Sequence, residues 1–214
     1  MNWTDEGYIL NLFQYAENSS IISILSKNHG HHKGVVYGGT SSKLKKILQI
    51  GNKIKVMWKS KSEDKLGYFN VELVKPVSPI YFENEKKLTS IFSSTSLCYQ
   101  ILPERNIYTK IFNDFDLMIS YLPNDNFFKE YVLWEHKLLN DLGFDKNISV
   151  DDEFKILNQK IFYPHFFFKT DSSFNDLDIY NGLLINKSKF LNFIFDPNKL
   201  KMPYHRLRLE KFFS

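Results

Sequence analysis

Residues 54–60, IKVMWKS, decide the fold of the N-terminal part of this chain. Their apolar side chains alternate with the basic Lys55 and Lys59, and a period of two is the pattern of a strand with one buried face. The alternation places Trp58 on the apolar side of the strand. We therefore expect Trp58 to belong to a hydrophobic core.

Four further short apolar runs lie on either side of this strand, separated by turns rich in Gly, Asn and polar residues. They are residues 7–15 (GYILNLFQY), 20–26 (SIISILS), 34–38 (GVVYG) and 67–74 (GYFNVELV). Five short strands of this kind fit a small closed or partly closed barrel better than an open sheet.

The pattern changes after the segment 75–79, KPVSP, whose two prolines interrupt both strands and helices. Beyond it, apolar residues recur every three or four positions, as on one face of a helix. This spacing predicts helices over 88–102, 107–122 and 127–142, shorter ones near 187–195 and 204–213, and an irregular segment over 150–185. We expect an α+β chain of two domains, residues 1–78 and 79–214.

Charge is distributed unevenly along the 214 residues, although the formal net charge is only +4. Residues 1–75 carry a net charge of +5 and the remaining residues a net charge of −1. A basic domain joined to a neutral one is typical of a protein that binds a polyanion. The single cysteine, Cys98, excludes an internal disulfide and a multi-cysteine zinc site, and it lies on an apolar helical face.

The start of the chain lacks the order of a secretion signal, and no apolar run is long enough to span a membrane. We therefore expect a soluble, cytoplasmic protein.

Lysines are densest between Lys27 and Lys65, a stretch that has ten lysines and only two acidic residues. Lysines neutralise phosphates, while Gly amides and Ser hydroxyls add hydrogen-bond donors. We predict DNA contacts from Lys33, Gly38, Gly39, Ser41, Ser42, Lys43, Lys45, Lys46, Lys55 and Lys59. Tyr37 and Trp58 are candidates for stacking on unpaired bases if their rings face solvent. The alternatives are a merely solvated lysine face and core packing of the aromatic rings.

Two other kinds of site are less well supported by the spacing. Residues 38–40 lack the GxxxxGK[ST] pattern of nucleotide hydrolases. His29, His31 and His32 have no carboxylate or cysteine nearby in the sequence, so we expect a pH-dependent phosphate contact there and no metal.

Acidic clusters leave open a metal-dependent nuclease as an alternative. Asp114 and Asp116 lie two apart on a predicted helix and point in different directions. Asp151, Asp152 and Glu153 resemble a loop or a helix start. We expect no catalysis, no metal and no cofactor. An RNA-binding protein is a further alternative, because the sequence does not distinguish the two sugars.

Several stretches resemble the RecO family of DNA recombination mediators, particularly its alphaproteobacterial type. In chain order, the matching stretches are residues 3–10 (WTDEGYIL), 28–39 (NHGHHKGVVYGG), 48–52 (LQIGN), 102–105 (LPER), 134–144 (WEHKLLNDLGF) and 202–209 (MPYHRLRL). They extend over nearly the whole chain in the order that the family has them.

This resemblance implies an N-terminal OB-fold followed by a helical domain, in a protein that is not an enzyme. It also implies binding of single- and double-stranded DNA, annealing of strands, and displacement of single-strand-binding protein for recombinase loading in the RecF pathway. The implied partners are RecR and the C-terminal tail of single-strand-binding protein, and the implied location is the cytoplasm, at the nucleoid.

The chain departs from the family in two ways. Many members carry a four-cysteine zinc module just after the LGF stretch, whereas residues 149–152 here read SVDD, so we expect no zinc. The family often has arginine where this chain has His31 and Tyr37. Lysines, among them Lys33 and Lys43, are candidates to replace those contacts, although Lys lacks the bidentate fork of Arg.

Overall fold

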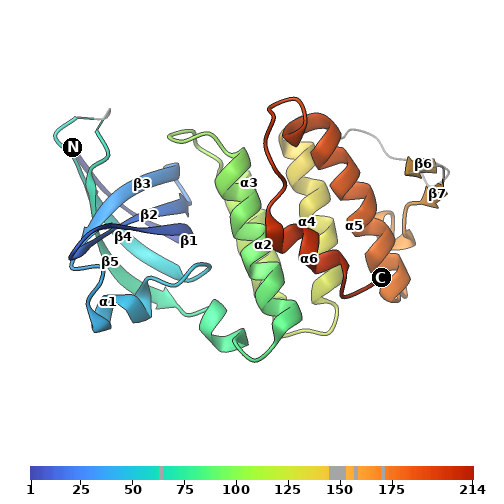
Figure 1. Cartoon of the computed structure of the whole chain (residues 1–214), viewed down its shortest axis with the longest axis horizontal. Helices are drawn as coiled ribbons and strands as arrows, with labels where there is room; N and C mark the ends of the chain where they lie inside the picture. Colours follow the sequence, from blue (N-terminus) through green and yellow to red (C-terminus); the bar gives the residue numbers. More distant parts are fainter. Residues whose placement is uncertain (63–64, 145–152, 157–158, 170–171) are drawn as a thin grey trace. The chain divides into compact units, whose positions relative to one another are not determined.

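The computed structural model describes residues 1–62, 65–144, 153–156, 159–169 and 172–214 (Figure 1). The chain folds into two compact units, Met1–Phe112 and Asn113–Ser214, and each is described by itself. The predicted domain boundary after residue 78 stays a prediction.

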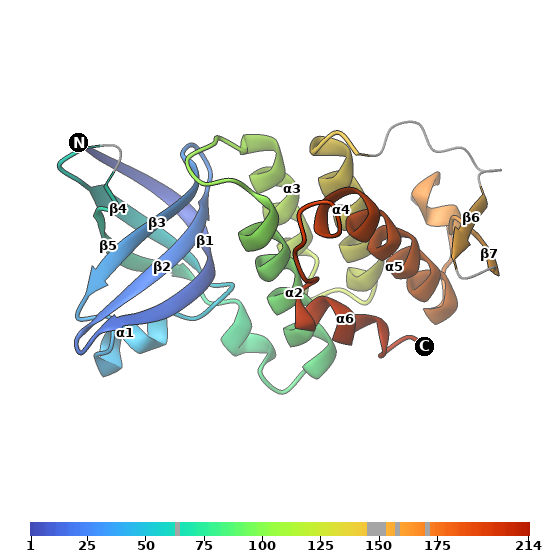
Figure 2. The same cartoon turned by 45° about the horizontal axis from the view of Figure 1, so that its top comes forward.

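Five strands form a closed barrel in the first unit (Figures 1 and 2). They are β1 (Asn2–Ala16), β2 (Ser19–Ser26), β3 (Gly30–Tyr37), β4 (Lys53–Lys59) and β5 (Tyr68–Lys75). Their order is β1-β2-β3-β5-β4, and neighbours are antiparallel except β3 and β5, which meet in parallel. The predicted α+β fold, with an N-terminal five-stranded barrel followed by helices, is confirmed.

The alternating apolar residues of β4 form part of the barrel core, as their spacing predicted. Ile54, Val56 and Trp58 are buried, whereas Lys55 and Met57 on the same strand are exposed. Apolar residues of the other strands complete the cluster: Ile9, Ile22, Ile24, Val36 and Phe69. Trp58 is only 4% exposed and its indole Nε1 donates to the Leu66 carbonyl at 3.2 Å, which confirms its predicted place in the core.

A short helix, α1 (Ser42–Ile47), lies between β3 and β4, where the sequence pattern predicted neither a helix nor a strand. Ser41 caps it, because its hydroxyl accepts a hydrogen bond from the Leu44 amide at 3.4 Å. Six residues are too few to show a helical period, so the cap is the only local signal for this helix.

The first unit also contains a 3-10 helix (Ser78–Tyr81) and α2 (Glu85–Ile101), which packs against β1. Several buried positions of α2 are hydroxyl residues that bond to their own helix, as Ser94 does to the Ile91 carbonyl at 2.9 Å. The next helix, α3 (Thr109–Ser120), begins in this unit. Both helices occupy the predicted positions.

The second unit contains α4 (Phe127–Asp141), α5 (Asp176–Phe190), α6 (Tyr204–Glu210) and the strand pair β6 (Glu153–Ile156) and β7 (Gln159–Phe162). The expectation of an irregular segment up to residue 185 is wrong, because α5 begins at Asp176. A π-helical turn, Leu191–Phe195, continues α5.

Candidate nucleic-acid interface

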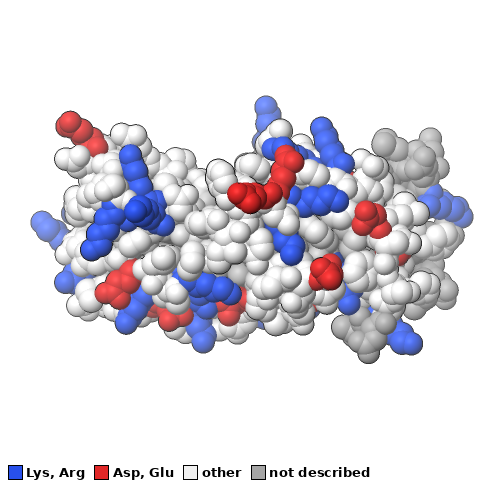
Figure 3. Space-filling view, turned by 90° about the horizontal axis from the view of Figure 1, so that it is seen from below, with Lys and Arg blue, Asp and Glu red and all other residues white. Residues whose placement is uncertain are grey.

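The lysines of α1 form one exposed group on the barrel unit. Lys43, Lys45 and Lys46 are exposed, and so are Ser41 and Ser42 at the start of the helix. Among the described residues, none of the three ammonium groups has an acidic partner within ion-pair distance. In Figure 3, Lys and Arg side chains are scattered over the face that includes the barrel, with isolated acidic side chains between them.

Lys55 and Lys33 lie elsewhere and in a different charge environment. Lys55 is exposed on β4, but its register partners on the two neighbouring strands are Glu6 and Glu72. The Lys33 ammonium lies 2.6 Å from the Glu104 carboxylate and 5.1 Å from the centre of the Tyr99 ring. Burial alone would lower the pKa of Lys33, but the hydrogen bond and charge of Glu104, with a smaller contribution from Tyr99, together outweigh it and raise that pKa.

Gly38 and Gly39, which were predicted as DNA contacts, form part of the turn between β3 and α1. Gly38 has a φ of +70°, which favours glycine. Gly39 is buried, its amide donates to the Val36 carbonyl at 3.3 Å, and a Cβ there would lie 2.8 Å from the Ser20 hydroxyl. The Gly39 amide is therefore occupied within the fold.

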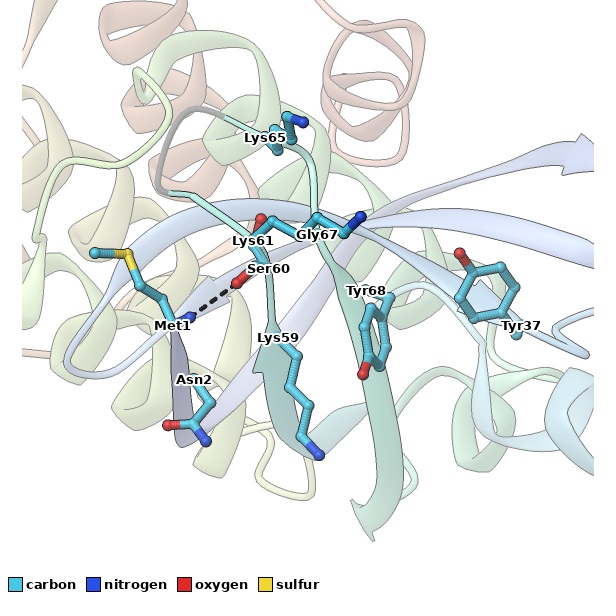
Figure 4. A pocket seen from close by; sticks show the side chains of 9 residues that line it. All are labelled: Met1, Asn2, Tyr37, Lys59, Ser60, Lys61, Lys65, Gly67 and Tyr68. Carbon is cyan, nitrogen blue, oxygen red and sulfur yellow. Dashed lines mark hydrogen bonds between the residues drawn. The ribbon is translucent and has the colours of Figure 1, made fainter.

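Lys59 lies in a second group that sequence reasoning did not bring together, a pocket of about 720 Å³ at one end of the barrel (Figure 4). We call this pocket the lysine–tyrosine groove. Its lining comes from the start of β1, the end of β3, the end of β4 with the following turn, and the start of β5: Met1, Asn2, Tyr37, Lys59, Ser60, Lys61, Lys65, Gly67 and Tyr68. None of the described lining residues is acidic, and Glu63 and Asp64 of the turn lie outside the described residues.

Two aromatic rings and three cations give the groove its chemical character. Tyr37 is 68% exposed, and its ring centre lies 5.9 Å from that of Tyr68 at an interplanar angle of 53°. The exposed Tyr37 ring and the half-buried Tyr68 ring suit stacking on bases, and Lys59, Lys61 and Lys65 suit phosphates. The register explains the arrangement, because Lys59 pairs directly with Tyr68 across β4 and β5.

Sequence reasoning missed Lys61, Lys65 and Tyr68 as members of this site. The two lysines were assigned only to a polar turn, and Tyr68 only to a strand. The available signal was the turn itself, since the residues that flank a hairpin turn lie close together at the end of the two strands.

The three histidines around the start of β3 do not converge on one point. His31 is buried, and its ring contacts the Ser23 hydroxyl through Nε2 and the Leu102 carbonyl through Nδ1, each at 2.6 Å. The ring of His29 stacks instead on Trp3, with 4.1 Å between centres.

The histidine environments also argue against the predicted pH-dependent phosphate contact at neutral pH. Burial lowers the pKa of His31, and it lowers that of His32 to about 4. Both rings are therefore neutral near pH 7. In the part of the chain that the structure describes, no three His, Cys, Asp or Glu side chains gather in a way that suits a metal ion.

Of the residues considered for catalysis, Asp114 forms an ion pair. The Asp114 carboxylate is 3.7 Å from the Lys137 ammonium. Asp151 and Asp152, together with most of the segment where the family's zinc module would begin, lie outside the described residues. Cys98 is buried as predicted, which raises the pKa of its thiol. None of the described helices has the length and apolar character needed to cross a bilayer.

Comparisons with known proteins agree with the resemblance. Residues 1–77 match the family model described as Recombination protein O N terminal. The protein named DNA repair protein RecO from Roseobacter denitrificans is 32% identical over 145 residues, which cover 67% of this chain and 60% of that protein.

Two further proteins of the same name show similar figures. The one from a Jannaschia species is 32% identical over 70% of this chain and 61% of its own length. The one from Rhodospirillum centenum is 28% identical over 67% of this chain and 58% of its own length. The chain therefore spans about three fifths of the length of these relatives.

Proposed function

Because the chain belongs to the RecO family of DNA repair proteins, we propose that it is a non-enzymatic recombination mediator whose barrel binds DNA. The relatives' names refer to DNA repair and not to an enzymatic activity. The observation that carries the proposal is the lysine–tyrosine groove, which lies in the segment that matches the family's N-terminal model.

In this proposal, a single strand lies along the groove. Lys59, Lys61 and Lys65 neutralise its phosphates, and Tyr37 and Tyr68 stack on its bases. The turn 38–41 leads directly from Tyr37 to α1, so the α1 lysines extend the cationic surface from one side of the groove. Ser41 and Ser42 are exposed at the start of α1 and can donate to phosphate oxygens.

The proposed surface differs from the set expected from sequence. It includes Lys43, Lys45, Lys46 and Lys59, but it omits Lys33, whose ammonium is held by Glu104. It omits Lys55 because Glu6 and Glu72 lie beside it in the sheet. It also omits Gly38 and Gly39 as direct DNA contacts, because the turn between β3 and α1 already explains why both positions are glycine.

Annealing follows from the same charge. Two lysine groups on one small unit lower the repulsion between two DNA strands that bind them, so complementary strands can meet. We propose double-stranded DNA as a second ligand for this reason. The family relationship supports RecR and the C-terminal tail of single-strand-binding protein as partners, and a place in the cytoplasm at the nucleoid.

The test measures the affinity for a fluorescent single-stranded DNA over a range of salt concentrations. We expect the variant Lys59→Glu/Lys61→Glu to bind more weakly at low salt. We also expect a shallower slope of log affinity against log salt, by about 0.7 for each lost phosphate contact. The variant Lys43→Glu/Lys45→Glu/Lys46→Glu tests the α1 group in the same way.

The matched control is Lys199→Glu/Lys201→Glu, which makes the same change of net charge at exposed lysines of the second unit. It should leave the slope unchanged. A folded groove variant that binds like the wild type would overturn the assignment of the groove. Competition by an RNA of the same sequence at equal strength would favour the RNA-binding alternative.

A further inference from the structure

A second pocket of about 650 Å³ in the barrel unit has walls that are mostly aromatic. We call it the aromatic pocket. It is lined by Trp3, His29, His32, Trp58, Arg105 and Ile107, and by Met1 and Asn2, which also line the lysine–tyrosine groove. The two hollows are therefore neighbours, and a strand that follows one reaches the other.

Three rings of the pocket form a nearly parallel stack. Trp3 lies between His29, 4.1 Å away at 7°, and Trp58, 5.6 Å away at 19°. The His32 ring stands edge-on to Trp3, with 5.2 Å between centres and an angle of 67°. Trp3 therefore has a ring neighbour on each face, so a flat aromatic ligand in the pocket meets ring edges in T-shaped contacts.

Hydrogen bonds hold this arrangement in place before any ligand arrives. The Asp5 carboxylate accepts from the backbone amide of Asn28 at 2.7 Å and lies 3.2 Å from Nδ1 of His29. Burial raises the pKa of Asp5, but these hydrogen bonds outweigh it and lower that pKa, so the carboxylate stays charged. The His29 ring is thereby fixed against Trp3.

The polar groups at the pocket match the edge of a nucleobase. No described residue forms a hydrogen bond to the ring nitrogens of His32. As a neutral imidazole it offers one donor and one acceptor. Arg105, the only arginine of the first unit, is exposed at the pocket and has a φ of +65°. Its amide donates to the His31 carbonyl at 2.7 Å, which ties this strained residue to β3.

We propose that the aromatic pocket binds one unpaired nucleobase of a strand whose phosphates lie along the lysine–tyrosine groove. This proposal rests on the proposed DNA-binding function and gives it a preference for single strands over duplex DNA, because bases in a duplex are stacked and paired. Ile107, 68% exposed, adds an apolar edge to the opening. The lysines of the lysine–tyrosine groove bind the phosphates, and the aromatic pocket adds a contact that requires a base.

The test compares a thymidine oligonucleotide with a strand of the same length and charge built only from abasic sugar-phosphate units. The wild-type chain should bind the thymidine strand at least about tenfold more tightly. The variant His32→Ala should lose affinity for the thymidine strand several-fold and keep its affinity for the abasic strand. The groove variant Lys59→Glu/Lys61→Glu should lose affinity for both strands.

A fluorescence readout keeps the proposal testable if His32→Ala does not fold. In the variant Trp134→Phe, the remaining tryptophans are Trp3 and Trp58, which both line the pocket. The thymidine strand should quench their emission, and the abasic strand should not.

The outcomes separate the two proposals. If the wild type binds neither strand, both fail. If folded His32→Ala loses affinity for both strands alike, or keeps the wild-type affinity for the thymidine strand, the pocket proposal alone is overturned. If the wild type binds both strands equally, stacking on Tyr37 and Tyr68 in the lysine–tyrosine groove is overturned as well.

Discussion

At the scale of single residues, the barrel holds two histidines in their neutral form. His31 is buried between the Ser23 hydroxyl and the Leu102 carbonyl, and the pKa of His32 is about 4. In the unfolded chain both take up a proton near the ordinary pKa of about 6.5. Between those pH values the unfolded state binds more protons, so the free energy of unfolding falls as pH falls from about 6.5 towards 4. Urea unfolding at a series of pH values measures this loss.

The variant His31→Gln isolates the contribution of one ring, because an amide side chain donates and accepts hydrogen bonds but does not titrate. Its free energy of unfolding should fall less steeply over the same pH range. Equal slopes for His31→Gln and the wild type would contradict the prediction.

At the scale of elements, the sequence predicts those whose apolar period is long and regular. The five barrel strands, α2, α3 and α4 show such a period, and α4 ends at Asp141, just before Gly143, whose φ is +87°. The helix α5 was missed because Gly182 and Asn186 interrupt its pattern and both are buried in tertiary contacts. Its one local signal was the capping box of Asn175 and Asp178.

The sequence predicted the kind of chemistry at the candidate site, but only some of the residues that form it. A lysine-rich barrel followed from charge and spacing alone. The groove depends on the register of Lys59 with Tyr68 and on Tyr37 at the end of β3, which brings together residues far apart in the chain. The aromatic pocket also needs Arg105 and Ile107, which follow α2 in the chain and lie beside the start of β3. No local sequence pattern predicts this contact.

The contact between the start of β3 and the loop at Asn106 can be tested by substitution. Gly30 has a φ of +69°, and a Cβ there would lie 1.7 Å from the Asn106 carbonyl oxygen. Gly143 has a φ of +87°, but a Cβ there would meet no atom within 4 Å. We expect Gly30→Ala to lower the free energy of unfolding by about 2–5 kcal/mol, from strain plus overpacking.

Gly143→Ala is the matched control, since it carries the left-handed strain without the collision. It should cost about 1–2 kcal/mol. Chemical unfolding followed by circular dichroism measures both changes. If the two variants lose the same stability, the close packing of Gly30 against the loop at Asn106 is not a feature of the folded protein.

At the scale of the whole molecule, cationic groups serve different purposes in the two units. In Met1–Phe112, exposed lysines border the groove and extend along α1. In Asn113–Ser214, the guanidinium of Arg206 is fully buried, with Nε 2.5 Å and Nη2 3.0 Å from the two oxygens of Glu135. Tyr131 and Asn186 also donate to that carboxylate. Basic residues of the C-terminal MPYHRLRL stretch are therefore not interchangeable as candidates for DNA contacts.

The buried pair leads to a prediction that separates stability from DNA binding. Replacing Arg206 by Met removes the partner of a buried carboxylate, so the free energy of unfolding should fall by about 3–5 kcal/mol. The double variant Glu135→Leu/Arg206→Met removes both charges and should lose less than the single variant. The emission of Trp134, in the second unit, reports the transition. Folded Arg206→Met should keep the affinity and salt slope of the wild type for single-stranded DNA, because both proposed DNA surfaces lie within Met1–Phe112; a changed slope would place Arg206 among the DNA contacts.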